Sequence, residues 1–204
     1  MNKLAFWIAR WRNDDAALMT LSQPLSALMD DLRGRKIALV GNARALGETE
    51  SGPAIDAADI VIRLNAAPLP LARSHGSRTD WLCMSIAVPP AVIAARAPQR
   101  LIWVTPKRKR LPWAMAQDPR FAMLPAEGQK ALMERLGSRP TTGMQMIDLL
   151  SKSDAAQVDL WGFDFFASQS LSGGRAAKHV PHDFAAEARE VAALLARDAR
   201  FTRH

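Results

Sequence analysis

The stretch Lys36-Ile37-Ala38-Leu39-Val40-Gly41-Asn42 joins a continuous apolar run to a glycine and an asparagine. Such apolar runs are typical of strands that are buried on both faces of a parallel sheet. The glycine and asparagine favour a turn where the strand ends. Open α/β sheets bind ligands beyond the carboxyl ends of their strands, so the stretch predicts both a fold class and the place of a polar site.

Strand-type and helix-type patterns alternate along the rest of the chain, as in an α/β fold with a mainly parallel sheet flanked by helices. Further strands are expected at residues 60–64, 81–84, 101–105 and 158–161. Helices are expected at residues 4–11, 24–32, 89–96, 126–136 and 183–197, with one more after Gly143. Residues 107–125 are expected to form a long mobile loop. We expect a single domain at residues 34–204, preceded by a helical arm at residues 1–33.

The composition fits one globular domain that favours an anionic partner. The chain has 204 residues, 49% of them hydrophobic, and a net charge of +7. Nucleic acid, an acidic membrane surface and a phosphorylated or carboxylated substrate all fit this charge. The basic run Lys107–Arg110 by itself is interpreted as a solvated loop.

The cysteine content and the first apolar run bear on the compartment. Cys83 is the single cysteine, which excludes an internal disulfide and a cysteine-rich metal site. A reducing compartment is the simplest interpretation. The run from Leu4 to Ala9 is too short for a signal-peptide core or a membrane span. We therefore expect a cytoplasmic protein.

An apolar stripe at helical spacing, flanked by basic residues, marks the start of the arm. The stripe consists of Leu4, Trp7, Ile8 and Trp11. Two interpretations are open. The stripe anchors the protein peripherally on the inner face of the membrane, or its tryptophans pack on the domain.

Asparagines follow two predicted strands, Asn42 after the first and Asn65 after the second. Together they could grip one polar ligand, and Gly41 would allow the backbone to approach a phosphate or a ribose. Both asparagines could also be simple turn residues. Neither a dinucleotide-binding fingerprint nor a Walker motif is present.

The turn Pro140-Thr141-Thr142-Gly143 precedes a predicted helix. Free backbone N–H groups and the helix dipole make such a turn suited to an anion. The alternative is that Thr141 or Thr142 only caps the helix.

A third segment contains His179, His182 and Glu187. His182 begins a predicted helix, where the dipole favours a neutral imidazole that can accept a proton. Glu187 falls at the edge of that helix's apolar stripe and needs a partner if it is buried. The alternative is a capping Asp183, two surface histidines and a rim glutamate.

In this order the segments resemble the sialylmotifs of glycosyltransferase family 29. Residues 36–42, 52–68 and 76–80 look like the large sialylmotif. Residues 139–144 and 158–163 look like the small one, and His182 followed by Glu187 is similar to the very small motif. The resemblance spans residues 36–187.

The resemblance implies a variant GT-A (Rossmann-like) fold and an inverting transferase that needs neither metal nor cofactor. The substrate would be a CMP-activated acidic keto-sugar, sialic acid or Kdo, and the acceptor a glycan or glycolipid hydroxyl. His182 would be the general base. Donor-binding residues would be Asn42, Asn65, Thr141, Thr142, Gly143, Gly162 and His179, supported by Gly41 and Glu187.

The chain also departs from the family. It cannot form the disulfide that usually joins the large and small motifs, and the aromatic third motif is not recognisable. One alternative is a non-catalytic relative that binds a CMP-sugar or a glycan. Nucleic acid is not an expected partner, because Lys107–Arg110 lacks the organisation of a known binding module.

Overall fold

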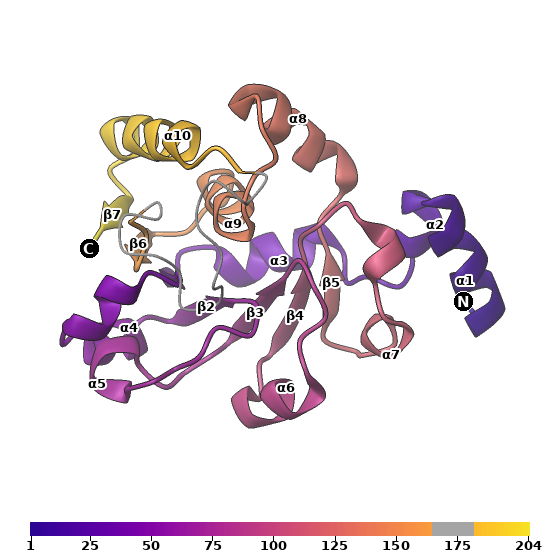
Figure 1. The fold of residues 1–204 in the computed structure, drawn as a ribbon, viewed down its shortest axis with the longest axis horizontal. Coiled ribbons are helices and arrows are strands. Elements are labelled where there is room, and N and C mark those ends of the chain that lie inside the picture. Colours follow the sequence, from indigo (N-terminus) through magenta and orange to yellow (C-terminus); the bar gives the residue numbers. More distant parts are fainter. Residues whose placement is uncertain (165–181) are drawn as a thin grey trace.

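The computed structural model describes residues 1–164 and 182–204, and in them a seven-stranded sheet runs through the molecule (Figure 1). Its order is β5-β4-β3-β2-β1-β6-β7, and all neighbouring strands are parallel. The strands are β1 (Lys36–Val40), β2 (Ile60–Leu64), β3 (Trp81–Met84), β4 (Arg100–Trp103), β5 (Phe121–Met123), β6 (Gln157–Trp161) and β7 (Phe201–Arg203). The predicted α/β fold class is confirmed.

Helices cover both faces of the sheet. One face carries α3 (Leu25–Leu32), α8 (Ala126–Leu136), α9 (Thr142–Ser151) and α10 (Phe184–Arg197). The other carries η1 (Arg44–Glu48), α4 (Gly52–Asp56), α5 (Ala72–His75), α6 (Pro90–Arg96) and α7 (Trp113–Ala116). Two N-terminal helices, α1 (Lys3–Arg12) and α2 (Asp15–Met19), lie beyond the β5 end of the sheet (Figure 1).

Strand side chains alternate between these two covered faces. Ile37 and Leu39 pack in the core under α3, α8, α9 and α10, whereas Ala38 and Val40 pack on the opposite face with η1 and α4. Burial of both faces favours apolar residues at nearly every strand position. This is the physical reason why β1, β2 and β3 have the predicted bounds. Arg63 of β2 is the buried exception in this group of strands, and its guanidinium donates to the carbonyls of His75 and Arg78.

The N-terminal helices contribute to the same cores as the strands. Phe6 and Leu18 are fully buried in a cluster with Leu82 of β3 and Trp103 of β4, and Leu32 of α3 belongs to the main core. The division of the chain at residue 33 stays a prediction.

The prediction of one long loop at residues 107–125 is wrong. This stretch contains the 3-10 turn η2 (Arg108–Arg110), then α7, then β5. The elements of this stretch have three or four residues each, and prolines at 112, 119 and 125 interrupt the apolar pattern, so no period is visible. Packing on β4 stabilises β5. The edge strand β7 was missed for the same reason.

Candidate active site

The candidate site lies along the carboxyl edge of the sheet, where the strand order reverses. Strands β2 to β5 extend from β1 in one direction and β6 and β7 in the other, so the switch point lies between β1 and β6. Gly41 follows β1 and Gly162 follows β6, and a β-carbon on Gly41 would lie 2.4 Å from the Gly162 carbonyl oxygen. Gly41 therefore allows the close approach of two strand ends, and Gly162 itself has a φ of +65° that favours glycine. Asn42 follows Gly41 at this switch point.

A polar cluster joins the next two strand ends to α9. Asn65 follows β2 with a φ of +53°, and its Nδ2 donates to Thr142 Oγ1 at 3.4 Å. The Asn65 side-chain oxygen accepts the Ser85 N–H at 3.1 Å, and the hydroxyls of Ser85 and Thr142 lie 2.6 Å apart. The structure thus brings together Asn65 and Thr142, two residues to which the resemblance assigns donor binding, and that role stays a prediction. Ser85 was missed, although it follows the strand 81–84 just as Asn65 follows 60–64.

Thr141 and Glu187 hold the beginnings of α9 and α10 together. Glu187 is 3% exposed, and its carboxylate accepts the Thr141 N–H at 2.6 Å and the Thr141 hydroxyl at 2.8 Å. The Thr141 hydroxyl also accepts the Met144 N–H at 3.0 Å, so it caps α9 as the alternative interpretation expected. Burial raises the pKa of Glu187 to about 7, although both hydrogen bonds from Thr141 favour the charged form. Glu187 is a buried positioning residue rather than a rim glutamate.

His182 lies just before Asp183, which caps α10, and a carbonyl of the neighbouring segment fixes its ring. His182 Nδ1 lies 2.6 Å from the Arg139 carbonyl oxygen. Because a carbonyl can only accept, Nδ1 carries the proton and Nε2 of the neutral ring carries the lone pair. Burial lowers the pKa of His182; the bond to Arg139 opposes this shift, and the charges of Arg139 and Lys107 add to it. The ring is therefore set up to accept a proton at Nε2 near neutral pH.

The sequence model described as glycosyltransferase family 29 (sialyltransferase) matches residues 5–112, more than half of the chain. The chain belongs to glycosyltransferase family 29. It is therefore a glycosyltransferase, as the sequence motifs predict. No curated protein sequence matches the chain.

Solved structures extend the likeness beyond the residues of the family match. A mammalian sialyltransferase in complex with Gal-beta-1-3GalNAc-ortho-nitrophenol is 21% identical, with a TM-score of 0.68 over 98% of this chain and 84% of the other. The sialyltransferase CstII from Campylobacter jejuni, in complex with the substrate analogue CMP-3FNeuAc, is 12% identical with a TM-score of 0.52, over 83% and 79% of the chains. These likenesses confirm the sialyltransferase-type fold for the part of the chain that contains α9 and α10.

In this family 29 enzyme, several residues of the stretch that resembles the large sialylmotif form a hydrogen-bonded scaffold between α4 and the loop before β3. The Asp56 carboxylate accepts hydrogen bonds from the backbone of Ser77 and Arg78, and the Arg78 guanidinium binds the carbonyls of Asp56 and Ala58. Burial opposes the ionisation of Asp56, but these bonds outweigh it and lower its pKa. This scaffold fixes the loop before β3, so the motif stretch combines structural residues with site residues.

Gly143 and Phe163 show how α9 meets the switch point. A β-carbon on Gly143 would lie 2.7 Å from the Phe163 ring, and one on Gly41 would lie 3.2 Å from the same ring. The Phe163 ring therefore lies between the end of β1 and the start of α9. It leaves no room for a side chain at position 41 or 143, which explains why both residues are glycine. Whether Gly143 also contacts a donor stays a prediction.

His179, predicted to hold the leaving phosphate, lies outside the described residues. Among residues 1–164 and 182–204, no three acidic, histidine or cysteine side chains are grouped as metal ligands would be.

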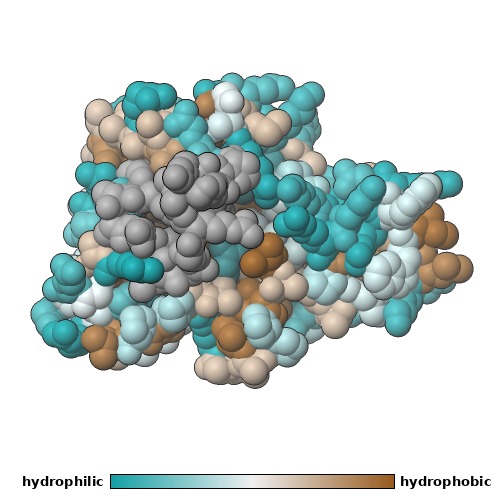
Figure 2. Space-filling model, in the orientation of Figure 1, coloured by the Kyte–Doolittle hydropathy of each residue, from teal (hydrophilic) through white to brown (hydrophobic). Residues whose placement is uncertain are grey.

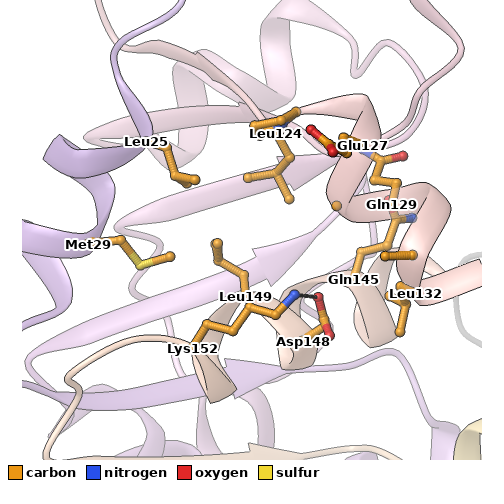
Figure 3. Close-up of a pocket in the computed structure, with 13 residues that line it drawn as sticks. Leu25, Met29, Leu124, Glu127, Gln129, Leu132, Gln145, Asp148, Leu149 and Lys152 are labelled. Atoms are coloured by element: carbon orange, nitrogen blue, oxygen red, sulfur yellow. Dashed lines mark hydrogen bonds and ion pairs between the residues drawn. The ribbon is translucent and has the colours of Figure 1, made fainter. Parts of the chain in front are cut away.

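A separate cavity of about 330 Å³ lies among α3, α8 and α9 (Figure 3). Leu25, Met29 and Leu149 contribute to an apolar lining, and Lys152 turns to Asp148 at one side. None of its lining residues is a predicted site residue.

Proposed function

We propose that the enzyme transfers an acidic keto-sugar, sialic acid or Kdo, from a CMP donor to a glycan hydroxyl. The observation that carries the proposal is the junction of α9 and α10. There a histidine whose Nδ1 is bound to the Arg139 carbonyl, so that Nε2 carries the lone pair, lies near the N-terminus of α9 and its cluster of polar strand-end residues, in a family 29 fold. Structures of the similar bacterial enzyme CstII hold CMP or CMP-3FNeuAc, which supports a CMP-linked donor.

The first step of the proposed reaction is activation of the acceptor. His182 Nε2 takes the proton of the acceptor hydroxyl while Nδ1–H stays bonded to the Arg139 carbonyl. The acceptor oxygen forms a bond to the anomeric carbon of the donor as the bond from that carbon to the phosphate oxygen breaks, and the electron pair leaves with CMP. Attack opposite to the leaving phosphate inverts the anomeric centre.

The N-terminus of α9 would hold the departing phosphate. In the described part of the chain, the backbone N–H groups of Thr142 and Gly143 have no hydrogen-bond acceptor, whereas Met144 donates to the cap. Donors of this kind, together with the helix dipole, stabilise negative charge that develops during a reaction. We include metal-free catalysis in the proposal because the N-terminus of α9 can stabilise the negative charge of the departing phosphate, which a metal cation stabilises in other enzymes.

We also propose that α1 contacts an anionic membrane surface. Leu4 is 70% exposed and Trp11 74% exposed, and Trp7 and Ile8 are exposed between them. The hydrophobic area at the right-hand end of Figure 2 lies over this helix. Trp7 also contacts the ring of the buried Phe6, whereas Trp11 is largely exposed. Lys3 and Arg12 on the same helix suit acidic headgroups. No helix within residues 1–164 and 182–204 is long and apolar enough to cross a bilayer.

Incubation with CMP-Neu5Ac and with CMP-Kdo in separate reactions tests the proposed donor. With Gal-beta-1-3GalNAc-ortho-nitrophenol as acceptor and EDTA present, we expect CMP release and a new glycoside with at least one donor. Proton NMR of that product reports the anomeric configuration. Activity that EDTA abolishes would reject metal independence, and retained configuration would reject inversion. Absence of transfer from either donor, by protein that binds CMP, would reject the reaction itself.

A further inference from the structure

The basic turn η2 is held in place by its central arginine. Arg108 is fully buried, and its guanidinium binds Asp15 of α2 at 2.5 Å. The same guanidinium donates to the Thr105 carbonyl at 2.8 Å and to the Leu124 carbonyl at 2.7 Å. The interpretation of Lys107–Arg110 as a solvated loop is therefore wrong for this arginine. Because these contacts fix the turn, the backbone that carries its exposed basic residues has a defined position.

The turn adjoins the exposed apolar stripe of α1. Arg10 Nη1 donates at 3.0 Å to the carbonyl of Leu111, the residue that follows η2. The Arg10 guanidinium also lies 4.3 Å from the centre of the Trp7 ring, which belongs to the stripe. A second contact joins α1 to α7, since the ring centres of Phe6 and Trp113 are 4.9 Å apart. The stripe and the turn are therefore neighbouring parts of one surface.

The exposed cations of the turn are available to an anionic partner. Lys109 and Arg110 are exposed, and neither forms a salt bridge with an acidic side chain among residues 1–164 and 182–204. Residues 165–181 contain no Asp or Glu in their sequence. Figure 2 shows a hydrophilic area beside the hydrophobic end of the molecule. Cations next to an exposed apolar stripe are typical of segments that bind acidic bilayers, because apolar burial and headgroup attraction then act together.

The turn also lies at the edge of the sheet that carries the candidate site. All neighbouring strands are parallel, so β4 ends at the same edge as β1 and β2, which Asn42 and Asn65 follow. η2 is reached from β4 by a short connection. The ends of β2 and β4 are two strand spacings apart, about 10 Å. A bilayer that contacts this turn would therefore lie close to the candidate site.

We propose that η2 and the stripe of α1 form one membrane-binding surface, and that the enzyme acts on acceptors carried by lipids of that membrane. This surface, the membrane face, consists of Leu4, Trp7, Ile8, Trp11, Lys109 and Arg110. The inference rests on the proposed transfer reaction and on the proposed contact of α1, and it adds the acceptor class. Anionic headgroups bind the turn while the stripe enters the interface. Binding the bilayer and the acceptor together raises the effective concentration of the acceptor at the site.

Sedimentation with vesicles of phosphatidylserine and phosphatidylcholine tests the surface. Lys109→Gln combined with Arg110→Gln should weaken binding by about 25-fold, because each basic residue near an anionic surface contributes a factor of roughly five. The matched control is Arg35→Gln combined with Lys36→Gln. It removes the same two residue types from the exposed start of β1, at the opposite edge of the sheet. This control should bind within about twofold of the wild type.

Transfer to two forms of one acceptor tests the acceptor class. Gal-beta-1-3GalNAc is offered as the soluble aryl glycoside or linked to diacylglycerol in the same vesicles. The wild-type kcat/KM should be at least about tenfold higher for the vesicle-borne form. The Lys109 and Arg110 double variant should lose that advantage and retain activity on the soluble form, whereas the Arg35 and Lys36 control should keep both.

Three results would overturn the proposal. They are equal vesicle binding by the two double variants, no vesicle binding by the wild type, and equal use of the two acceptor forms by the wild type. If Trp11→Glu loses binding while the Lys109 and Arg110 variant keeps it, the contact of α1 stands and the role of the turn is rejected. Absence of transfer to either acceptor form would reject the proposed reaction, and vesicle binding would still decide whether the turn belongs to the membrane face.

Discussion

At the scale of single residues, one hydrogen bond decides what His182 can do. The Arg139 carbonyl places the proton on Nδ1, and burial with two nearby cations keeps the ring neutral. Neutral imidazole at the pH of the cell is what a general base requires. The protein uses the surroundings of one ring to set its tautomer, its orientation and its basicity together.

The pH dependence of the reaction follows from this environment. Because the folded-state pKa of His182 is lowered from 6.5, the ring is unprotonated at neutral pH and available as a base. We expect kcat/KM to fall only as the pH drops below 6.5. A pH profile of kcat/KM at a saturating CMP donor measures the pH at which this acidic limb falls. Lys107→Gln should move the limb to higher pH, because it removes a positive charge that lowers the pKa of His182. A wild-type limb above 6.5 would contradict the assignment.

Glu187 should leave a signature in the pH dependence of stability. Its pKa is raised from 4.5 to about 7 in the folded protein, so the folded state binds the proton more tightly than the unfolded chain. This group therefore contributes less stability as the pH rises from about 4.5 through 7, by up to about 3 kcal/mol. Glu187→Gln should remove that slope.

Urea unfolding of wild type and Glu187→Gln at a series of pH values measures the difference between them. The difference isolates Glu187, because the other titrating groups are common to both proteins. A difference that does not change between pH 4.5 and 8 would show that the carboxylate is ionised throughout.

At the scale of elements, the site depends on how closely α9 approaches the β1–β6 switch point. Gly143 has no room for a side chain, because Phe163 occupies that position. Phe163 is in turn partly buried against the main core. The N-terminus of α9 is thus positioned by packing on one side and by Glu187 on the other.

Gly143→Ala should push this helix end away from the strand ends. Overpacking of this kind costs about 1–3 kcal/mol in the free energy of unfolding. We expect that loss in urea unfolding, with a weaker CMP affinity in calorimetry. Gly128→Ala in α8, where a β-carbon meets nothing within 4 Å, is the matched control. It should raise the free energy of unfolding by up to about 1 kcal/mol through helix propensity and leave CMP affinity unchanged. If Gly143→Ala bound CMP with full affinity, the N-terminus of α9 would not contribute to donor binding.

The exposed stripe of α1 gives a prediction for membranes. Phe6 is fully buried, so removing the helix would damage the core, whereas Trp11 is largely exposed. Trp11→Glu should reduce co-sedimentation with phosphatidylserine vesicles by roughly tenfold, through lost apolar burial and added negative charge. Glu48→Gln in η1 serves as a distant charge control. Equal sedimentation of Trp11→Glu and wild type would reject the membrane contact.

The sequence predicts elements well where burial is two-sided and poorly where elements are short. The bounds of β2 and α8 agree with the prediction, because β2 is a nearly continuous apolar run and α8 lies between Pro125 and Gly137. β5 and β7 have three residues each and depend on a neighbouring strand for their stability. Their sequences therefore contain no periodic signal.

At the scale of the whole molecule, the site is made of contacts between distant parts of the chain. Thr141 and Glu187 are 46 residues apart, and Asn65 and Thr142 are 77 apart. The motifs identified these residues individually, but their spacing could not show that Glu187 holds Thr141. Nor could it show that Arg108 is buried against Asp15. Pairings of this kind become visible only when the sheet order is known.

Turnover of two His182 variants tests the central claim most directly. His182→Ala removes the base, and His182→Gln retains a donor for the Arg139 carbonyl without a group that can take the acceptor proton. With CMP-Neu5Ac and a saturating acceptor, both should lower kcat by about 10²–10⁴-fold. Their CMP affinities in calorimetry should stay within about twofold of wild type. Near-normal kcat in either variant would contradict the account, because the acceptor would then lose its proton to another group.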